Sequence, residues 1–312
     1  MTGRINLSGK DVCRFEHQAM ATLFEVMIAC EDPVYAQSAA VEAFQEIDRL
    51  ELELSRYNPN SDISRLNNLS PHSSIRIGYD AFQCLLESIR YAELTGGAFD
   101  VTVGRLMDCW IARDKSARNP SIQEIEEALA SCGRTLLELD EASMMVRTGA
   151  VVPCIDLGAI GKGYAVDCVI ELLKEWEIGS ALVHGGMSSV FAFGEYQHQN
   201  GWPVTLSDPR TPDTILRTVT LDERALGGSG VKKGFHIIDP RSGQPVRHRH
   251  AAWVVADSAT QSDALSTACM MMTKTEIEQL VLQQPHNWAM IVDEPSNHHS
   301  YSVFQYGSSL SV

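Results

Sequence analysis

The residues best suited to chemistry lie in Pro153–Asp167, which reads PCIDLGAIGKGYAVD. An apolar run at Val151–Ile155 has the composition of a strand, and a helical pattern of apolar residues follows Lys162. We therefore expect a strand, a glycine-rich turn and the start of a helix. Such a turn lets backbone N–H groups approach an anion, Lys162 adds a positive charge, and Asp156 offers a carboxylate to a hydroxyl, a ring N–H or a metal.

A purely structural turn is the alternative interpretation of this stretch. Lys162 is followed by Gly163 rather than by Ser or Thr, and the first glycine of a Walker A loop is missing. The spacing does not match G-x-G-x-x-G either. The glycines alone therefore do not decide between a nucleotide-type site and an ordinary turn.

A second pair of oxygen-bearing side chains occurs near the end of the chain, at Asp263 and Thr267. The pattern from Ser262 onward is helical, so residues four apart share one helix face. The pair could serve as helix caps. It could also supply two hard oxygen ligands to Mg²⁺, which takes few protein ligands and completes its shell with water and substrate phosphate.

Composition indicates a globular protein and excludes several classes of function. The chain has 312 residues, of which 44% are hydrophobic and 21% charged, and its net charge is −15. That charge argues against sequence-independent binding of nucleic acid or of an anionic membrane. No run approaches the roughly 20 apolar residues of a membrane span. The first 20 residues contain no apolar signal region, which predicts a cytoplasmic protein, although a trimmed chain would look the same.

The eight cysteines predict reduced thiols rather than a metal site. No two are spaced as C-x-x-C, and most lie in apolar segments. Their even number permits disulfides, but their scatter is more typical of buried thiols.

Hydrophobic periodicity predicts an α+β fold with mixed or antiparallel sheets packed with helices, as a single domain with two lobes. Amphipathic helices are expected at Gln37–Ser55, Asp80–Thr95 and Ser121–Ala130. Strands are expected at Phe24–Ile28, Leu136–Leu139, Met144–Arg147, Ser180–His184, Val190–Phe193, Val204–Leu206, Thr218–Leu221 and Val254–Ala256. Phe235–Pro245 is expected to be a strand that enters a tight turn, and the run from Val151 to His184 to form a strand–helix–strand unit.

Six motifs occur in order between Met20 and Ala268: M-x-T, S-x-Y-N-x-x-S-D-I-S-x-L-N, G-G-A-F-D-V-T-V-G, D-L-G-A-I-G-K-G-Y-A-V-D, G-S-G…H-I-I-D-P-x-S-G-x-P and S-D-A-L-S-T-A. This set resembles the ApbE family of FAD:protein FMN transferases. The resemblance implies Mg²⁺-dependent transfer of FMN from FAD to a Thr or Ser hydroxyl of an acceptor protein, with release of AMP. It also implies a flavin transferase domain at 15–312, preceded by a short flexible segment at 1–14.

The resemblance implies a role for each matching residue. The expected FAD contacts are Met20, Tyr57, Ala98, Phe99, Asp100, Asp156, Lys162, Ser229, His236, Ile237 and Asp239. The expected metal ligands are the Ala159 carbonyl and the side chains of Asp263 and Thr267. Lys162 and the metal would stabilise charge that develops on phosphate, and Asp156 is grouped with them as catalytic. His236 is the preferred general base, with the Asp residues as alternatives.

Three positions depart from the family pattern: Gly228, Phe235 and Met187. They bear on efficiency and acceptor choice more than on FAD binding. Two other functions therefore stay open. Water could replace the acceptor hydroxyl, which gives FAD hydrolysis to FMN and AMP, or the chain could bind a flavin without catalysis.

Overall fold

A nine-stranded sheet organises the fold, and neighbouring strands are antiparallel at every pairing. The computed structural model describes residues 3–5 (backbone only), 12–112, 114, 116–231, 234, 236–294 and 302–307. The strand order is β1-β2-β3-β7-β8-β13-β14-β15-β16. The strands are β1 (Gly3–Ile5), β2 (Val12–Ala19), β3 (Thr22–Ala29), β7 (Ala181–Gly185), β8 (Ser189–Phe193), β13 (Arg224–Gly230), β14 (Arg249–Ala256), β15 (Trp288–Asp293) and β16 (Ser302–Tyr306).

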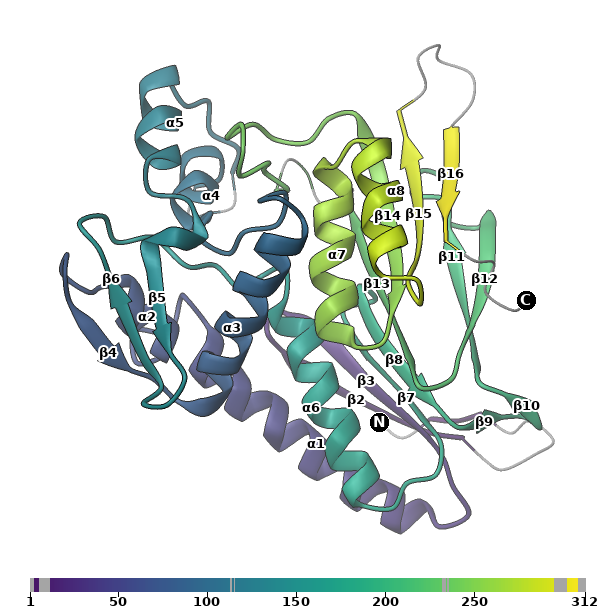
Figure 1. The fold of residues 1–312 in the computed structure, drawn as a ribbon. Coiled ribbons are helices and arrows are strands. Elements are labelled where there is room, and N and C mark those ends of the chain that lie inside the picture. Colours follow the sequence, from purple (N-terminus) through teal and green to yellow (C-terminus); the bar gives the residue numbers. More distant parts are fainter. Residues whose placement is uncertain are drawn as a thin grey trace.

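The two faces of this sheet are covered differently. Helices α1 (Pro33–Leu54), α6 (Gly161–Glu175) and α7 (Ala259–Met271) lie over one face and enclose the larger hydrophobic core (Figure 1). The hairpin of β11 (Trp202–Ser207) and β12 (Ile215–Leu221) shares a second core with side chains of the opposite face. Helix α8 (Lys274–Gln283) packs beside β15 and β16, and β9 (Glu195–Tyr196) pairs with β10 (Gln199–Asn200).

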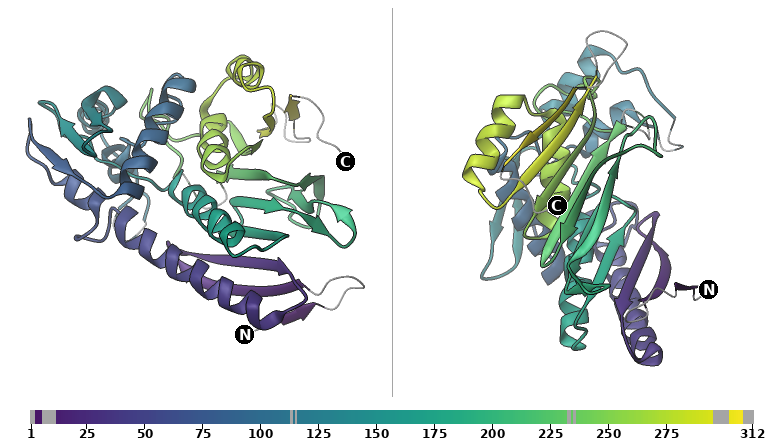
Figure 2. Two further views of the ribbon diagram at one scale, coloured as in Figure 1. Left: turned by 60° about the horizontal axis from the view of Figure 1, so that its bottom comes forward. Right: turned by 90° about the vertical axis from the view of Figure 1, so that its right-hand side faces the viewer.

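A smaller lobe lies at one side of the large sheet (Figures 1 and 2). It contains a three-stranded antiparallel sheet, in the order β4-β6-β5. Its elements are α2 (Asp62–Asn67), β4 (Ser74–Arg76), α3 (Tyr79–Leu94), α4 (Gly104–Trp110), α5 (Ile122–Leu129), a 3₁₀ turn at Arg134–Leu136, β5 (Leu137–Asp140) and β6 (Met145–Thr148). The arrangement confirms the predicted α+β class with antiparallel sheets.

Most predicted elements are present, with shifted ends. The predicted helix at Gln37 begins at Pro33, because the Asp32 side chain accepts hydrogen bonds from the first turn. Val41 is exposed, and small alanines fill much of the buried stripe. The third predicted helix has the expected capping box between Ser121 and Glu124. All eight cysteines are free thiols, as expected.

The predicted strand at Val151–Ile155 is wrong, and with it the strand–helix–strand unit. The segment runs beside residues 101–104, where the Cys154 carbonyl accepts from Gly104 N and Asp156 N donates to the Val101 carbonyl. Pro153 has no N–H, and the described contacts amount to one isolated bridge rather than a ladder. The segment is therefore extended without belonging to a sheet.

Two further predictions concern Phe235–Pro245 and the N-terminal segment. The predicted strand at Phe235–Pro245 is wrong over its described part, which has only an isolated bridge between Ile238 and Pro245, although the tight turn is present. Phe235 and most of the predicted N-terminal segment 1–14 lie outside the described residues. Strand β2 already begins at Val12, before the expected domain start.

Helix α7 is held closely between α6 and β13. A Cβ atom on Gly227 of β13 would lie 2.0 Å from the Ser262 carbonyl oxygen, and one on Gly163 of α6 would lie 2.2 Å from the Ala259 carbonyl oxygen. Only glycine permits these approaches, because no Cβ atom fits at such distances. Asp167 of α6 adds a carboxylate that accepts from Ala259 N at 2.7 Å and from Thr260 N at 2.8 Å.

We predict that Gly227→Ala lowers the free energy of unfolding by at least about 2 kcal/mol, because the new methyl group forces α7 away from the sheet. Chemical denaturation of both proteins measures the difference. Gly149→Ala is the control, since no atom lies within 4 Å of its Cβ position, and it should change stability by less than about 1 kcal/mol. Equal stability of Gly227→Ala and wild type would contradict the close packing.

We also predict that Asp167 makes the protein more stable as the pH falls from 7 to 4, relative to Asp167→Asn. Burial raises the pKa of Asp167 from 3.8 to about 6, against the opposing hydrogen bonds of Thr260 and Ala259. The folded state therefore retains a proton that the unfolded state releases, so this stabilisation is full below pH 3.8 and is lost as the pH rises through about 6. Between pH 7 and pH 4, the difference in unfolding free energy between wild type and Asp167→Asn should therefore shift by about 2–3 kcal/mol in favour of wild type, as unfolding at several pH values would measure.

Candidate functional site

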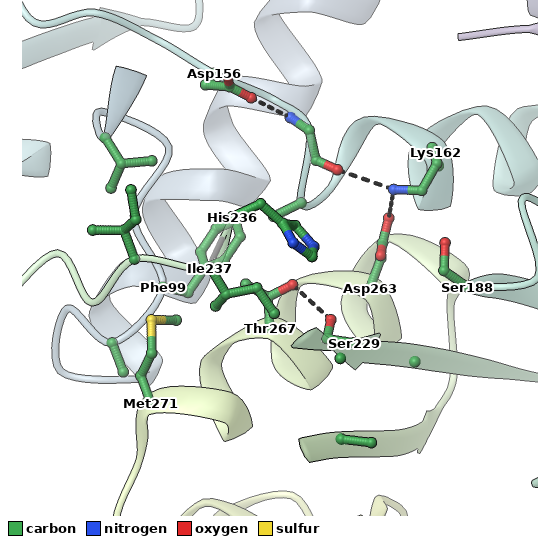
Figure 3. A pocket seen from close by; sticks show the side chains of 18 of the residues that line it. Phe99, Asp156, Lys162, Ser188, Ser229, His236, Ile237, Asp263, Thr267 and Met271 are labelled. Atoms are coloured by element: carbon green, nitrogen blue, oxygen red, sulfur yellow. Dashed lines mark hydrogen bonds and ion pairs between the residues drawn. The ribbon is translucent and has the colours of Figure 1, made fainter. Parts of the chain in front are cut away.

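A cavity of about 500 Å³ lies where α6, α7 and the end of β13 meet the loops of the smaller lobe. Eleven of the residues expected from the sequence line it: Ala98, Phe99, Asp100, Asp156, Ala159, Lys162, Ser229, His236, Ile237, Asp263 and Thr267. These residues come from segments far apart in the chain and surround one space (Figure 3). Its size is in the range of cofactor and small-molecule sites.

Three expected FAD contacts are not among the lining residues: Met20, Tyr57 and Asp239. Met20 occupies the tight turn between β2 and β3 with a φ of 48°, and its side chain packs on the large core. Tyr57 is 80% exposed. Asp239 lies between two lining residues but pairs with Arg241. Their predicted roles in FAD binding stay predictions.

Lys162 and Asp263 meet at the centre of the cavity. The Lys162 ammonium nitrogen lies 3.4 Å from Asp263 Oδ2 and 3.0 Å from the Gly158 carbonyl oxygen, to which it donates (Figure 3). Gly163 N also donates to Asp263 Oδ2, at 3.1 Å. Asp263 is buried, so these donors offset the cost of placing its charge there. The start of α6 thus presents a cation and backbone N–H groups to one carboxylate.

Thr267 lies one helical turn after Asp263, on the same side of α7 (Figure 3). Its hydroxyl oxygen is 2.9 Å from that of Ser229 on β13, which in turn lies 3.0 Å from the hydroxyl of Ser266. These hydroxyls fix one another's orientation across the junction of helix and sheet. The predicted pairing of Asp263 and Thr267 on one helix face is therefore realised at the cavity.

The oxygen donors here suit a small divalent cation such as Mg²⁺. One carboxylate, one hydroxyl and the nearby segment of Ala159 offer hard oxygen ligands, and Mg²⁺ uses few of these together with water and phosphate. The part of the chain that the structure describes has no cluster of three His, Cys, Asp or Glu side chains able to hold a metal. A transition-metal centre thus has no support there, whereas a phosphate-assisted Mg²⁺ site fits the donors.

Asp156 is held by Arg56, which the sequence analysis did not single out. Arg56 Nε lies 3.2 Å from Asp156 Oδ2, while Asp156 Oδ1 accepts from Gly158 N at 2.8 Å. Burial lowers the pKa of Arg56, but the carboxylates of Asp156 and Asp108 outweigh it and raise the pKa above its usual range. The Asp156 carboxylate oxygens that face this cation are hydrogen-bond acceptors, so they favour ligand groups that donate.

His236 contributes a ring nitrogen to the same cavity. Its Nδ1 lies 2.9 Å from the Gly234 carbonyl oxygen, which can only accept, so the neutral ring carries its proton on Nδ1. The lone pair is then on Nε2, the atom that a general base uses. Asp100, by contrast, accepts from the Thr102 N–H and hydroxyl, and so forms a turn at the cavity wall.

The cavity also has an apolar part. Phe99 and Ile237, two of the expected FAD contacts, lie near Met271 there (Figure 3). Met107 also lines the cavity. Flexible thioethers pack well against flat aromatic rings. At another part of the lining, Met187 is 88% exposed and has a φ of 59°, in the left-handed region that favours glycine or asparagine. Nothing in the sequence indicated Met107 and Met271 at the site, because only the fold brings them to the cavity.

The fold is α+β, and its cavity combines a lysine, carboxylates and hydroxyls with an apolar part. The chain belongs to the ApbE family, whose model matches residues 20–292. Among the described residues, no helix is both long and apolar enough to cross a membrane.

Characterised relatives agree with this assignment. The chain is 27% identical over 289 residues to an FAD:protein FMN transferase of Haemophilus influenzae, a match that covers 86% of this chain and 80% of the relative. A second FAD:protein FMN transferase, from Treponema pallidum, is 27% identical over 278 residues, with 81% and 76% covered.

Solved structures share the whole fold. The apo crystal structure of the flavinyl transferase ApbE from Pseudomonas stutzeri has a TM-score of 0.82 at 25% identity, with 97% of each chain covered. The ApbE protein of Thermotoga maritima has a TM-score of 0.84 at 26% identity, with 95% of this chain and 97% of that chain covered. The similarity thus extends over both lobes.

We predict that Arg56→Met destabilises the protein by about 2 kcal/mol, because Asp156 and Asp108 lose their common cation and the Arg56 side chain is only 10% exposed. Urea unfolding measures this loss. Arg90→Met is the control, since Arg90 pairs with Glu87 on the surface and its side chain is 68% exposed, and it should cost less than about 0.5 kcal/mol. Similar values for the two variants would show that Arg56 does not hold Asp156.

Proposed function

We propose that this chain is an FAD:protein FMN transferase that uses Mg²⁺, transfers FMN to a Thr or Ser hydroxyl of an acceptor protein and releases AMP. The transferase class and the use of FAD rest on the named relatives. The observation that carries the proposal is the meeting of Lys162, Asp263 and Thr267 at one cavity, where charge on a diphosphate could be neutralised.

The proposed reaction exchanges one phosphorus–oxygen bond for another. The acceptor hydroxyl oxygen bonds to the phosphorus of the FMN half, and the bond from that phosphorus to the bridging oxygen breaks. AMP leaves with the bridging oxygen and its electron pair, and the hydroxyl proton passes to a base. We assign that base to His236, and the tautomer with its lone pair on Nε2 supports the assignment.

The other cavity residues have separate proposed roles. Asp263, Thr267 and the Ala159 carbonyl would hold Mg²⁺, which neutralises charge on the diphosphate oxygens when bound. Lys162 adds a second positive charge beside Asp263. Asp156 would accept hydrogen bonds from donor groups of FAD, and Phe99, Ile237, Met107 and Met271 would contact a flat ring. Ala98, Asp100 and Ser229 shape the wall around these groups.

The proposal predicts that wild-type protein releases AMP from FAD with Mg²⁺ but not with EDTA, and that Asp263→Ala lowers this rate at least about a hundredfold. Chromatography of the nucleotides measures AMP, and mass spectrometry of an added Thr- or Ser-bearing acceptor detects an FMN adduct. Asp257→Ala is the matched control, because this largely exposed carboxylate just before α7 is outside the cavity lining.

The products distinguish the alternatives. If FMN and AMP form in equal amounts and no acceptor carries an adduct, the protein hydrolyses FAD instead of transferring FMN. Tight binding of FAD that stays intact with Mg²⁺ and a broad set of acceptors would show a flavin-binding protein without catalysis.

A further inference from the structure

A half-buried carboxylate outside the cavity joins the two helices that carry the cavity's charges. Asp167 of α6 is absent from the cavity lining. Its Oδ1 accepts from Ala259 N at 2.7 Å, and its Oδ2 accepts from Thr260 N at 2.8 Å and from the Thr260 hydroxyl. All these donors belong to the first turn of α7, over 90 residues later in the chain. The contact is therefore a tertiary joint between helices.

The joint has a second component one turn earlier on α6. Gly163 and Asp167 are four residues apart, so both face α7. The Ala259 carbonyl points at Gly163, where a Cβ atom would be only 2.2 Å from its oxygen, while the Ala259 N–H points at Asp167. The first peptide groups of α7 are thus fixed along α6 from both sides.

This joint sets where the next turn of α7 falls. Asp263 follows Ala259 by four residues, so it lies one turn further along the same face. There its Oδ2 accepts from Gly163 N at 3.1 Å and lies 3.4 Å from Lys162 Nζ. A helix shifted by one residue relative to α6 would move Asp263 about 1.5 Å along its axis and turn its side chain by about 100°.

Simple helix capping does not explain Asp167. Ser258, which belongs to the same segment as α7, already caps it by accepting from Gln261 N at 3.1 Å. A local cap stabilises a helix wherever it lies, but a carboxylate from α6 fixes its position relative to α6. That second property is what the placement of Asp263 requires.

We propose that Asp167 is a positioning residue for the divalent-cation site, because it fixes the start of α7 so that Asp263 and Thr267 present their oxygens beside Lys162. The inference rests on the proposed function, which assigns the cation to those two residues. Residues that orient metal ligands from behind typically account for 10- to 100-fold in metal affinity.

The test is a titration of Mg²⁺ into the full chain by calorimetry in the presence of ADP, which supplies diphosphate oxygens but no flavin to transfer. Asp167→Asn should bind Mg²⁺ about 10- to 100-fold more weakly than wild type. Asp80→Asn is the matched control: Asp80 is another poorly exposed carboxylate that accepts a hydrogen bond from α6, at 2.8 Å from the Tyr164 hydroxyl, but it does not contact the start of α7. Its affinity should stay within about twofold of wild type.

Each outcome has a distinct meaning. If folded Asp167→Asn binds Mg²⁺ within twofold of wild type, Asp167 is only a structural joint and the inference is overturned. If that variant does not fold, Thr260→Val removes the hydroxyl bond alone, and an unchanged affinity of this variant overturns the inference equally. If wild type binds no Mg²⁺ with ADP, the metal part of the proposed function fails, and the inference fails with it.

Discussion

The close approach of α7 to its two neighbours is the constraint on which the site depends. Gly163 and Gly227 remove side-chain atoms at the places where α7 passes α6 and β13. Without that approach, the side chains of Asp263 and Thr267 would not reach Lys162 and Ser229. Backbone proximity, rather than any single bond, therefore creates the site. Protein interiors are close-packed, so a shift at such a junction is transmitted rather than absorbed.

Charge is distributed so that an acidic protein can bind an anion. The chain has a net charge of −15, which disfavours anionic ligands at long range. Inside the cavity, Lys162 is paired with Asp263, and Arg56 behind it is paired with Asp156 and Asp108. Carboxylates outnumber cations here, because Asp100 also lines the cavity and Arg56 is shared by two carboxylates, so the cavity keeps a negative charge before a ligand enters. A divalent cation that arrives with a diphosphate would then supply the missing positive charge.

The sequence predicted the helices and most strands well, because their apolar periodicity survives in the structure. It predicted the grouping of Asp156, Lys162, Asp263 and Thr267 through motif order and resemblance. Prediction from the sequence failed where tertiary contacts set the conformation of a glycine or of an extended segment. Gly227–Gly230 received no predicted element, yet it ends β13, where the missing side chain of Gly227 admits α7.

For other features, the local sequence was misleading or uninformative. Val151–Ile155 has strand composition but pairs with no strand, because Pro153 and the loop at 101–104 shape it. Arg56 and Asp167 are charged residues within recognised motifs, and only their partners in space reveal what they hold. Such partners are defined by tertiary contacts, which periodicity cannot predict.

The order of the strands also has a dynamic consequence. Among the described residues, β1 and β16 form the two edges of the large sheet. Fraying starts at such edges and costs little free energy, whereas interior strands open only with the whole domain. β13, which carries Ser229, is an interior strand with β8 and β14 on either side. β13 pairs with β8 only over Arg224–Gly227, and within the described strands Ser229 pairs with Ala252 of β14 alone. The described sheet edges lie several strands away, so opening at either edge leaves the pairing of Ser229 with Ala252 intact.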